Sequence, residues 1–476
     1  MVMCNRSCRI TLVLLVFALF LIFAPDSEAV IRWAAAYGGD DSDFFTSLQQ
    51  TTGGGYVFAG STRSFGAQYN DGWVVKLDKY GRVSWGRRFG GTDWKDSDGF
   101  KSIRQTADGG YVVAGETWSF GAGSSDAWVI KLDSSGNITW QKTYGGSGGD
   151  QADCVRQTAD GGYIVAGSTW SFGSSKLIWV FKLSSSGAIV WEKAYGGSDG
   201  EEDALVEQTA DGGYIVAART WSFGAGYVDI LFLKLDENGN VEWRRTYGGS
   251  GWDEVNTIRQ TSDKGYIIAG TTGSFGAGRD NVWLIRLDQD GILSWQKTYG
   301  GNDSYESSYG SSLDITRDGN FIVAGSTESF GAGWSDIWVL KINTAGQILW
   351  EKRYGTSDSS DPATFIQQTA DGGYIVAGLN DILGGVTDVY LYKLDGNGDL
   401  PPCLSGFETH TTNAMVSIPS LPPFFIFKPL TVQNTTATVK NSTAVVTNAT
   451  PETKPLCAYD GHFLDHLPSI LLLLTP

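Results

Sequence analysis

The sequence predicts an all-β protein, a seven-bladed β-propeller with four antiparallel strands in each blade. Two recurring landmarks carry this prediction. The first is an aromatic residue after a glycine-containing turn, which recurs at intervals of 51–55 residues at Tyr56, Tyr111, Tyr163, Tyr214, Tyr266, Phe321 and Tyr374. The second is a tryptophan, which recurs at intervals of 51–55 residues at Trp33, Trp85, Trp140, Trp191, Trp243, Trp295 and Trp350. Seven repeats of about 53 residues, each with four short strands, are typical of a propeller.

Each repeat divides into four short strands, as the second repeat illustrates. Residues 101–106 lead into an Asp-Gly turn, and residues 111–117 are rich in β-branched side chains, which favours a strand. Residues 128–132 and 138–140 form two further strands, joined by a tight turn that contains glycine. Because no segment of the repeats shows a sustained 3.6-residue period, we expect no helices there.

The two ends of the repeat array complement each other. The seventh repeat ends at Pro401-Pro402 without its tryptophan strand, whereas a strand with tryptophan at residues 30–33 precedes the first complete repeat. We therefore predict that this N-terminal strand pairs with the strand at residues 390–394 and closes the ring. An open solenoid is the alternative, but both of its end repeats would then lack the polar caps that solenoids need.

Residues 1–29 have the pattern of a signal peptide. Arg6 and Arg9 precede an apolar run from Ile10 to Ala24, and small residues follow at a candidate cleavage site before residue 30. The apolar run has 15 residues, fewer than the roughly 20 that a spanning helix needs. We therefore expect cleavage rather than anchoring, a mature chain without a transmembrane span, and a secreted or cell-surface protein.

The C-terminal part has a different composition from the repeats. We divide the chain into the signal peptide, a propeller at residues 30–400 and a tail at residues 401–476 rich in Thr, Val and Asn. The tail contains three N-x-Ser/Thr sequons, for which we predict glycosylation, at Asn434, Asn441 and Asn448. Cys403 and Cys457 bracket the tail and are predicted to form a disulfide in an oxidising compartment. The tail is interpreted as either a stalk or a docking arm.

Composition excludes several classes of function. The chain has 35 Lys+Arg against 52 Asp+Glu, a net charge of −17, which argues against binding nucleic acid. All three histidines lie in the tail, so the repeats cannot hold Ser-His-Asp, Cys-His or His-ligated metal chemistry. Carboxylate acid/base chemistry is the catalytic option that remains. Whether the protein is an enzyme stays uncertain, and binding is the favoured interpretation.

An acidic position recurs thirteen residues before the repeat aromatic. It is Ser308 in the sixth repeat and acidic in the other six, at Asp43, Asp98, Asp150, Glu201, Asp253 and Asp361. In one interpretation each carboxylate accepts hydrogen bonds from loop N–H groups and recurs because the blade recurs. In the other, the carboxylates converge on the channel mouth and bind a divalent cation, with Ca²⁺ the candidate because it prefers oxygen ligands. We expect no other cofactor.

The connections that carry this acidic position are longer than those on the opposite face and hold additional tryptophans. Function usually lies on the longer loops. We therefore propose Trp118, Trp170 and Trp221 as candidates for stacking on sugar rings. The alternative is that they pack against the neighbouring blade. The sixth repeat departs most from the pattern, which singles out Tyr305, Glu306 and Tyr309 as a candidate specific site.

A family resemblance covers residues 30–450. Segments such as residues 158–167, Ser171-Phe172-Gly173 and Tyr195-Gly196-Gly197 resemble a family of secreted microbial, largely archaeal, repeat propellers. This resemblance implies the fold and an extracellular setting but no activity. Residues 131–133 with Gly136 and Trp140 are more distantly similar to the tryptophan-docking motif of quinoprotein-type propellers, in which the tryptophan packs between blades. The turn here is shorter, seven repeats replace the usual eight, and no adjacent cysteine pair is present.

We therefore expect an extracellular or cell-surface binding or scaffolding protein that acts through the long-loop face. The expected partners are glycans, cell-envelope proteins or divalent cations, and the propeller is expected to be monomeric. The first alternative is a carboxylate-dependent carbohydrate-active enzyme, which would show polar residues specific to a few repeats. The second, a quinoprotein-like oxidoreductase, is disfavoured by the residues present.

Overall fold

The computed structural model describes the ring and six strands of the tail. The described residues are 31–65, 67, 69–91, 97–276, 279–300, 307–328, 335–355, 362–380 and 387–402, with the tail strands at 408–409, 415–417, 431–434, 438–441, 445–448 and 452–459. Within these residues, no helix has the length and apolar character needed to cross a bilayer. The predicted signal peptide lies outside the described residues.

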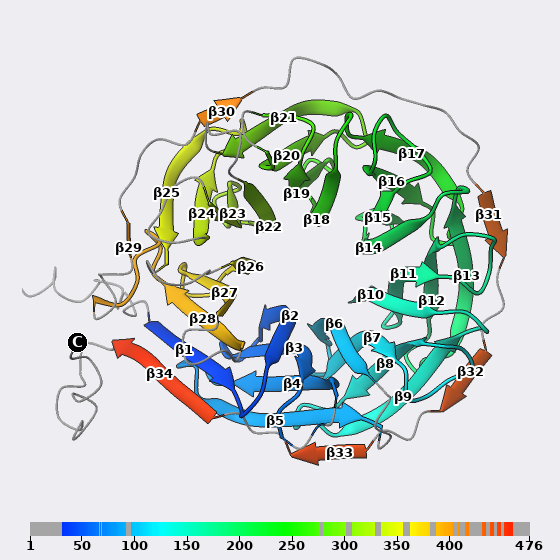
Figure 1. Ribbon diagram of the computed structural model, residues 1–476, viewed down its shortest axis with the longest axis horizontal. Helices are drawn as coiled ribbons and strands as arrows, with labels where there is room; N and C mark the ends of the chain where they lie inside the picture. The colour runs from blue at the N-terminus through cyan, green and yellow to red at the C-terminus, as the bar shows by residue number, and fades with distance from the viewer. Residues whose placement is uncertain are drawn as a thin grey trace, which may run out of the picture.

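Seven sheets surround a central channel, which confirms the predicted seven-bladed propeller (Figure 1). The first blade consists of β2 (Asp43–Gln50), β3 (Tyr56–Thr62), β4 (Asp71–Leu77) and β5 (Val83–Gly90). The second consists of β6 (Asp98–Gln105), β7 (Tyr111–Thr117), β8 (Asp126–Leu132) and β9 (Ile138–Gly145). The third consists of β10 (Asp150–Gln157), β11 (Tyr163–Thr169), β12 (Leu177–Leu183) and β13 (Ile189–Gly196).

The remaining four blades repeat this order from the channel outward. The fourth consists of β14 (Glu201–Gln208), β15 (Tyr214–Thr220), β16 (Asp229–Leu235) and β17 (Val241–Tyr247). The fifth consists of β18 (Asp253–Gln260), β19 (Tyr266–Thr272), β20 (Asn281–Leu287) and β21 (Leu293–Gly300). The sixth consists of β22 (Ser308–Ile315), β23 (Phe321–Thr327), β24 (Asp336–Ile342) and β25 (Ile348–Tyr354). The seventh contains β26 (Ala363–Gln368), β27 (Tyr374–Asn380), β28 (Asp388–Leu394) and β1 (Arg32–Gly38).

The N-terminal strand closes the ring, as predicted. β1 pairs antiparallel with β28, with Trp33 opposite Lys393 and Tyr37 opposite Val389. The seventh blade is therefore built from both ends of the repeat array, and this pairing ties the last blade to the first. Closure of this kind removes the exposed edges that an open array of sheets would leave.

The core lies between blades rather than inside any one of them. Val57 and Val74 of the first blade form one buried cluster with Val113, Trp128 and Ile130 of the second. The middle strands are apolar on both faces because each blade packs against two neighbours. Their sequences are therefore continuous apolar runs, without an alternation of apolar and polar residues. Each fully buried valine or isoleucine of these runs contributes about 1.5–3 kcal/mol of transfer free energy.

The recurring tryptophan holds neighbouring blades together. Trp140 of the second blade donates from Nε1 to the Ser185 carbonyl oxygen of the third blade at 3.1 Å, and the Tyr144 hydroxyl donates to the Gly187 carbonyl oxygen at 2.7 Å. Gly187 has φ +74°, and a Cβ there would lie 2.9 Å from the Trp140 ring. Only glycine meets both demands at low cost. This geometry is the packing that the tryptophan-docking resemblance implies.

The two faces of the ring differ in their connections. We call the face with residues 118–125 and 146–149, and their equivalents in other blades, the loop face. The opposite face carries the two short turns of each blade, such as residues 106–110 and 133–137, and we call it the hairpin face. The inner strand of every blade runs from the loop face to the hairpin face along the channel.

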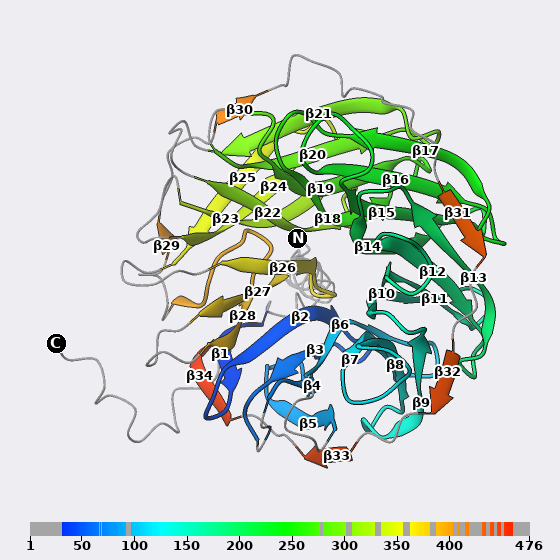
Figure 2. The ribbon, with the colours of Figure 1, turned by 45° about the vertical axis from the view of Figure 1, so that its right-hand side comes forward.

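The described strands of the tail lie against the outside of the ring (Figures 1 and 2). Each tail strand pairs antiparallel with the outermost strand of one blade: β29 (Glu408–Thr409) with β25, β30 (Met415–Ser417) with β21, β31 (Thr431–Asn434) with β13, β32 (Thr438–Asn441) with β9, β33 (Val445–Asn448) with β5 and β34 (Glu452–Tyr459) with β1. The tail therefore follows the blades in the reverse of their chain order and adds a fifth strand to six sheets.

The seven-residue spacing of the sequons matches one step between blades. Asn434, Asn441 and Asn448 are the last residues of β31, β32 and β33, opposite Lys193, Lys142 and Arg87. Their predicted glycosylation stays a prediction. Cys403 lies outside the described residues and the side chain of Cys457 is not described, so their predicted disulfide is also untested. Cys154, in β10, is a buried free cysteine.

Candidate functional site

The recurring carboxylates of the inner strands are buried at the loop-face end of each blade. Asp150 accepts from the Gly146 N–H at 2.8 Å, from the Ser171 hydroxyl at 2.6 Å and from the Thr169 hydroxyl. Asp43 accepts hydrogen bonds from the equivalent glycine N–H and from the equivalent serine and threonine hydroxyls, and Asp253 does the same. These bonds are those of the capping interpretation, in which the carboxylate fixes the loop that joins two blades.

The other described members of this set make similar hydrogen bonds, with small differences in their donors. Asp98 accepts from the Gly91 N–H at 3.0 Å and the Ser119 hydroxyl at 2.6 Å. Glu201 accepts from the Gly197 N–H at 3.2 Å and the Thr220 hydroxyl at 3.1 Å. In the sixth blade the Ser308 and Thr327 hydroxyls share a hydrogen bond of 3.1 Å. Asp361 lies outside the described residues.

A second buried aspartate meets this set across most blade junctions. It begins the third strand at Asp71, Asp126, Asp229, Asp336 and Asp388, and is replaced by Leu177 in the third blade and Asn281 in the fifth. A Cβ on Gly145 would lie 2.6 Å from an Asp150 oxygen and in collision with Asp126, so both carboxylates flank one glycine. Two acids are thus enclosed at one junction.

Burial raises the pKa of two acids of the second set, Asp71 and Asp229. Burial, opposed by Arg88 and reinforced by Asp98, raises the pKa of Asp71 to about 6. Burial, with Asp253 nearby, raises the pKa of Asp229 to about 7. The charged form loses hydration in both cases, and a second carboxylate adds repulsion.

The structure gives these carboxylates protein donors, and no group of three or more His, Cys, Asp or Glu side chains within the described residues is arranged to hold a metal ion. Binding of Ca²⁺ by the first set stays a prediction. Testing it requires the metal itself.

Amide bonds between blades form a second recurring feature, on the hairpin face. The Gln157 side-chain oxygen of the third blade accepts from the Ala107 N–H of the second at 2.8 Å. Gln208 accepts likewise from Ala159 at 2.9 Å. These glutamines link neighbouring blades. The sixth blade has Ile315 at this position, and a cavity of about 800 Å³ opens beside it between the fifth and sixth blades.

The repeats differ most where their inner strands face the channel. The position seven residues before the repeat aromatic is Gln49, Arg104, Arg156, Glu207, Arg259, Asp314 and Gln367. The position ten residues before it is Thr46, Lys101, Asp153, Ala204, Asn256, Ser311 and Thr364. A comparison of the repeats column by column would have found these residues, because the side chain at both positions changes from blade to blade.

The fourth blade has a distorted inner strand. Its second strand carries Ala218 where the other six blades have glycine. A Cβ at the equivalent Gly115 would collide with the Gly99 carbonyl oxygen of the inner strand. In the fourth blade the inner strand yields instead: Asp203 adopts φ +54°, and its pairing skips from Glu202 to Leu205. The methyl group of Ala218 therefore places Asp203 in the left-handed region of backbone conformation.

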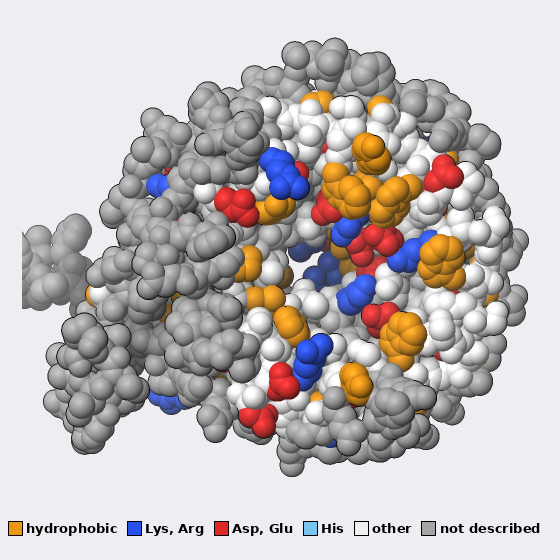
Figure 3. All heavy atoms as spheres, viewed as in Figure 1, with side chains coloured by type: hydrophobic (Ala, Val, Ile, Leu, Met, Phe, Trp, Pro, Cys, Tyr) orange, Lys and Arg blue, Asp and Glu red, His pale blue; other side chains and the backbone are white. Residues whose placement is uncertain are grey.

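Charged side chains specific to single blades gather at the loop-face rim of the channel. Arg219 pairs with Asp203 and contacts Glu254 at 3.1 Å, and Lys176 contacts Glu202 at 2.8 Å. Lys101 contacts Asp153 at 2.9 Å. We call these residues, together with Glu116, the rim cluster. It holds five carboxylates and three cations, and Figure 3 shows charged and hydrophobic side chains gathered around the central opening.

Two exposed tryptophans border a groove next to the rim cluster. Trp118 is 51% exposed and Trp170 is 55% exposed. They line a cavity of about 370 Å³ with polar groups from Glu116, Gln151 and Lys176. Burial is the main cause that raises the pKa of Glu116, with nearby Asp153 in the same direction and Lys101 opposing. The groove thus combines flat apolar rings with hydrogen-bonding groups.

The third predicted tryptophan has a different setting. Trp221 is partly buried and meets Trp252 edge to face, with ring centroids 6.0 Å apart. Trp252 is itself 45% exposed. The structure therefore places Trp118 and Trp170 on one groove and Trp221 in an aromatic pair with Trp252. Of the predicted sixth-repeat residues, Tyr309 is 39% exposed, and Tyr305 and Glu306 lie outside the described residues.

The chain is similar to several solved structures at low sequence identity. No family model and no curated protein matches it. Among solved structures it is similar to a protein of unknown function from Bacteroides caccae (14% identity, TM-score 0.32, 56% of this chain and 93% of that chain). It is also similar to an α-L-arabinofuranosidase of Fusarium graminearum (11%, 0.43, 76% and 98%) and to a sialidase of Streptococcus pneumoniae (10%, 0.39, 74% and 68%). These neighbours are propellers and include carbohydrate-active enzymes, but likenesses this distant carry no argument about the site.

Proposed function

We propose that this protein binds carbohydrate on its loop face, in the groove between Trp118 and Trp170, and that it acts outside the cell. The observation that carries the proposal is the exposure of both rings on one polar groove. Two large aromatic rings exposed on one polar groove offer a ligand a flat apolar surface, and exposed apolar patches rimmed by polar groups mark interaction sites. The apolar face of a sugar ring stacks on indole, while its hydroxyls need donors and acceptors of the kind that Gln151, Lys176 and Glu116 supply.

The extracellular setting rests on the sequence. The signal-like residues 1–29, the sequons of the tail and the resemblance to secreted repeat propellers all support it. The finer proposal of membership in that family is tested by homologues with the same repeat and tail order.

A glycan-array screen of the mature protein tests the proposal, followed by calorimetry with the best ligand. We expect Trp118→Ala and Trp170→Ala each to weaken binding about tenfold or more, because loss of one stacked ring removes on the order of 1–2 kcal/mol. Both variants should keep the wild-type melting temperature, since the rings are exposed. Tyr80→Ala, which removes a 39% exposed aromatic on the hairpin face, is the matched control. Wild-type affinity in both tryptophan variants would refute the proposed groove.

A second candidate function is carbohydrate hydrolysis at the same groove. It is favoured by Glu116, which has a raised pKa and stands where four other blades have serine or threonine, the fourth blade has Arg219 and the seventh has Leu379. A carboxyl group with a raised pKa suits general acid catalysis. Glu116→Gln should then abolish turnover of the array ligand while binding persists. If the wild-type protein leaves that ligand intact, the groove is a binding site only.

A further inference from the structure

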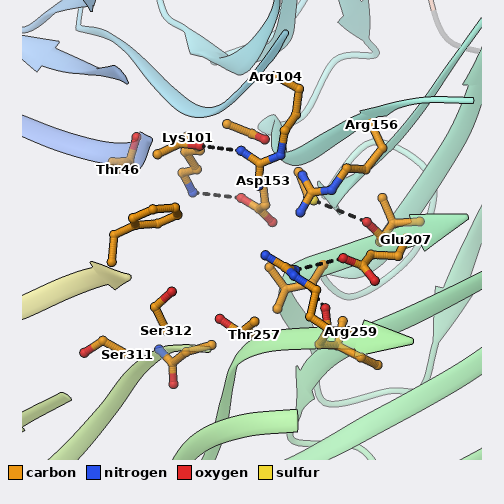
Figure 4. A pocket seen from close by; sticks show the side chains of 18 of the residues that line it. Thr46, Lys101, Arg104, Asp153, Arg156, Glu207, Thr257, Arg259, Ser311 and Ser312 are labelled. Carbon is orange, nitrogen blue, oxygen red and sulfur yellow. Dashed lines mark hydrogen bonds and ion pairs between the residues drawn. The ribbon is translucent and has the colours of Figure 1, made fainter. Parts of the chain in front are cut away.

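One cavity in the central channel is lined by more cationic than anionic side chains, although the chain as a whole is acidic. A cavity of about 110 Å³ in the channel is lined by the cations Lys101, Arg104, Arg156 and Arg259, and by two anions. Those anions are Asp153 and Glu207. Figure 4 shows the three guanidinium groups directed toward the same opening.

The two anions are already paired. Asp153 contacts Lys101 at 2.9 Å, and Glu207 contacts Arg259 at 2.8 Å. Within the part of the chain that the structure describes, Arg104 and Arg156 have no carboxylate within ion-pair distance. The Arg104 guanidinium instead donates to the Ser47 hydroxyl at 3.0 Å and to its neighbour's carbonyl oxygen at 2.6 Å. Burial, and then the charge of Arg156, lower the pKa of Arg104.

The same two positions lack acceptors that other blades supply. Gln49 accepts a hydrogen bond from the Gln105 N–H of the next blade at 2.7 Å, and Glu207 accepts from the Gln260 N–H at 3.3 Å. Asp314 and Gln367 accept in the same way. A guanidinium has only donors, so Arg104 and Arg156 cannot accept from the equivalent N–H groups of the third and fourth blades.

We propose that the channel binds a small tetrahedral oxyanion, phosphate or sulfate, between Arg104 and Arg156. Such an anion supplies the negative charge and the acceptors that these two blades lack, and planar guanidinium groups match its oxygens in pairs. The cavity is too small for a chain of sugars, so this site is separate from the carbohydrate groove. The arrangement is specific to adjacent blades and does not follow from the sevenfold repeat.

Titration of the full mature protein with inorganic phosphate tests this proposal, by calorimetry and melting temperature, against chloride at equal ionic strength. Wild-type protein should bind and melt at a higher temperature with phosphate. Arg104→Gln and Arg156→Gln install the side chain of the first and seventh blades and should weaken binding at least tenfold. Without phosphate they should melt at or above the wild-type temperature, because they remove a buried repulsion and restore an acceptor. Weaker phosphate binding together with an unchanged or higher melting temperature would show that the site is lost while the fold is kept.

Arg82→Gln is the matched control, because Arg82 is exposed on the hairpin face and its replacement removes the same charge far from the channel. It should bind phosphate as the wild type does. Absence of heat and of any melting shift in wild-type protein would overturn the proposal. Unchanged affinity in both channel variants would do the same.

Discussion

Aspartate recurs on both faces of the ring, and the two faces treat it in opposite ways. On the loop face, Asp229 is buried, and burial with Asp253 nearby raises its pKa to about 7. On the hairpin face, Asp108 is 64% exposed and lies 2.9 Å from the buried Lys131 ammonium. A bond from the Thr106 hydroxyl, together with Lys131, lowers the pKa of Asp108 to about 2.

The repeat determines where an aspartate stands in each blade, and the surroundings of that aspartate determine its pKa. Both aspartates recur because the blade recurs, yet one is enclosed beside another acid and the other meets a cation and solvent. Desolvation dominates on the loop face, and charge-assisted hydrogen bonds dominate on the hairpin face. Recurrence of a carboxylate is therefore no indication of its protonation state or its role.

The largest effect is expected at the loop face. Asp150→Ala removes the acceptor of the Gly146 N–H and of two hydroxyls, and should lower the free energy of unfolding by about 4 kcal/mol, because buried donors are left unsatisfied. Urea denaturation at pH 7 measures this loss. A loss below about 1 kcal/mol would show that the loop does not depend on this carboxylate. If Ca²⁺ raises the melting temperature of the wild type but not of this variant, the carboxylate also serves a cation.

A pH-dependent effect is expected at Asp229. The folded chain holds its proton up to about pH 7, whereas the unfolded chain releases it near 3.8. The free energy of unfolding therefore falls as pH rises between these values, by on the order of a few kcal/mol.

Asp229→Asn cannot ionise and copies the Asn281 that the fifth blade has naturally. Denaturation at pH 8 should show this variant more stable than wild type, and denaturation at pH 4 should show the two alike. A difference that does not vary with pH would contradict the raised pKa.

The smallest effect is expected at the hairpin face, where the first blade lacks the recurring aspartate. It has Gly53 in that position, so Lys76 lacks the aspartate that Lys131 contacts in the second blade. Burial lowers the pKa of Lys76. A Cβ on Gly53 would meet open space. Gly53→Asp should therefore stabilise the protein by about 0.5–1 kcal/mol at pH 7, with solvent screening limiting the gain.

Asp108→Asn is the inverse change and should cost a similar amount at pH 7. Because the pKa of Asp108 is lowered, its contribution is present above the ordinary value near 3.8 and is lost as pH falls toward 2. Thermal denaturation at pH 7 and pH 2 checks both variants. A gain from Asp108→Asn would contradict the pairing with Lys131.

The sequence predicted the ring closely and the site only in part. Seven blades and the closing strand followed from Trp33 and the repeat aromatics, since a fixed period leaves few architectures open. Trp118 and Trp170 were predicted on the loop face and lie on one groove. The rim cluster was not predicted. The predicted site residues were mainly those that recur in the repeats, whereas Glu116 and Arg219 each occur in a single blade.

The course of the tail was also beyond the sequence. Residues 431–448 read as a low-complexity stretch, and the backbone of such a stretch can pair with any free strand edge. Its seven-residue period acquires a meaning only when set against the spacing of neighbouring blades, a distance that exists in the folded ring.

The sequence by itself determined the number of blades, their strands and the docking tryptophans, because local patterns of apolar side chains and turn residues specify sheets and their repetition. The tertiary structure alone decided which single-blade residues meet at the channel, how Ala218 redirects Asp203, and which of many aspartates are enclosed. Those outcomes depend on contacts between neighbouring strands and between neighbouring blades, which exist only once the sheets have formed and packed around the channel.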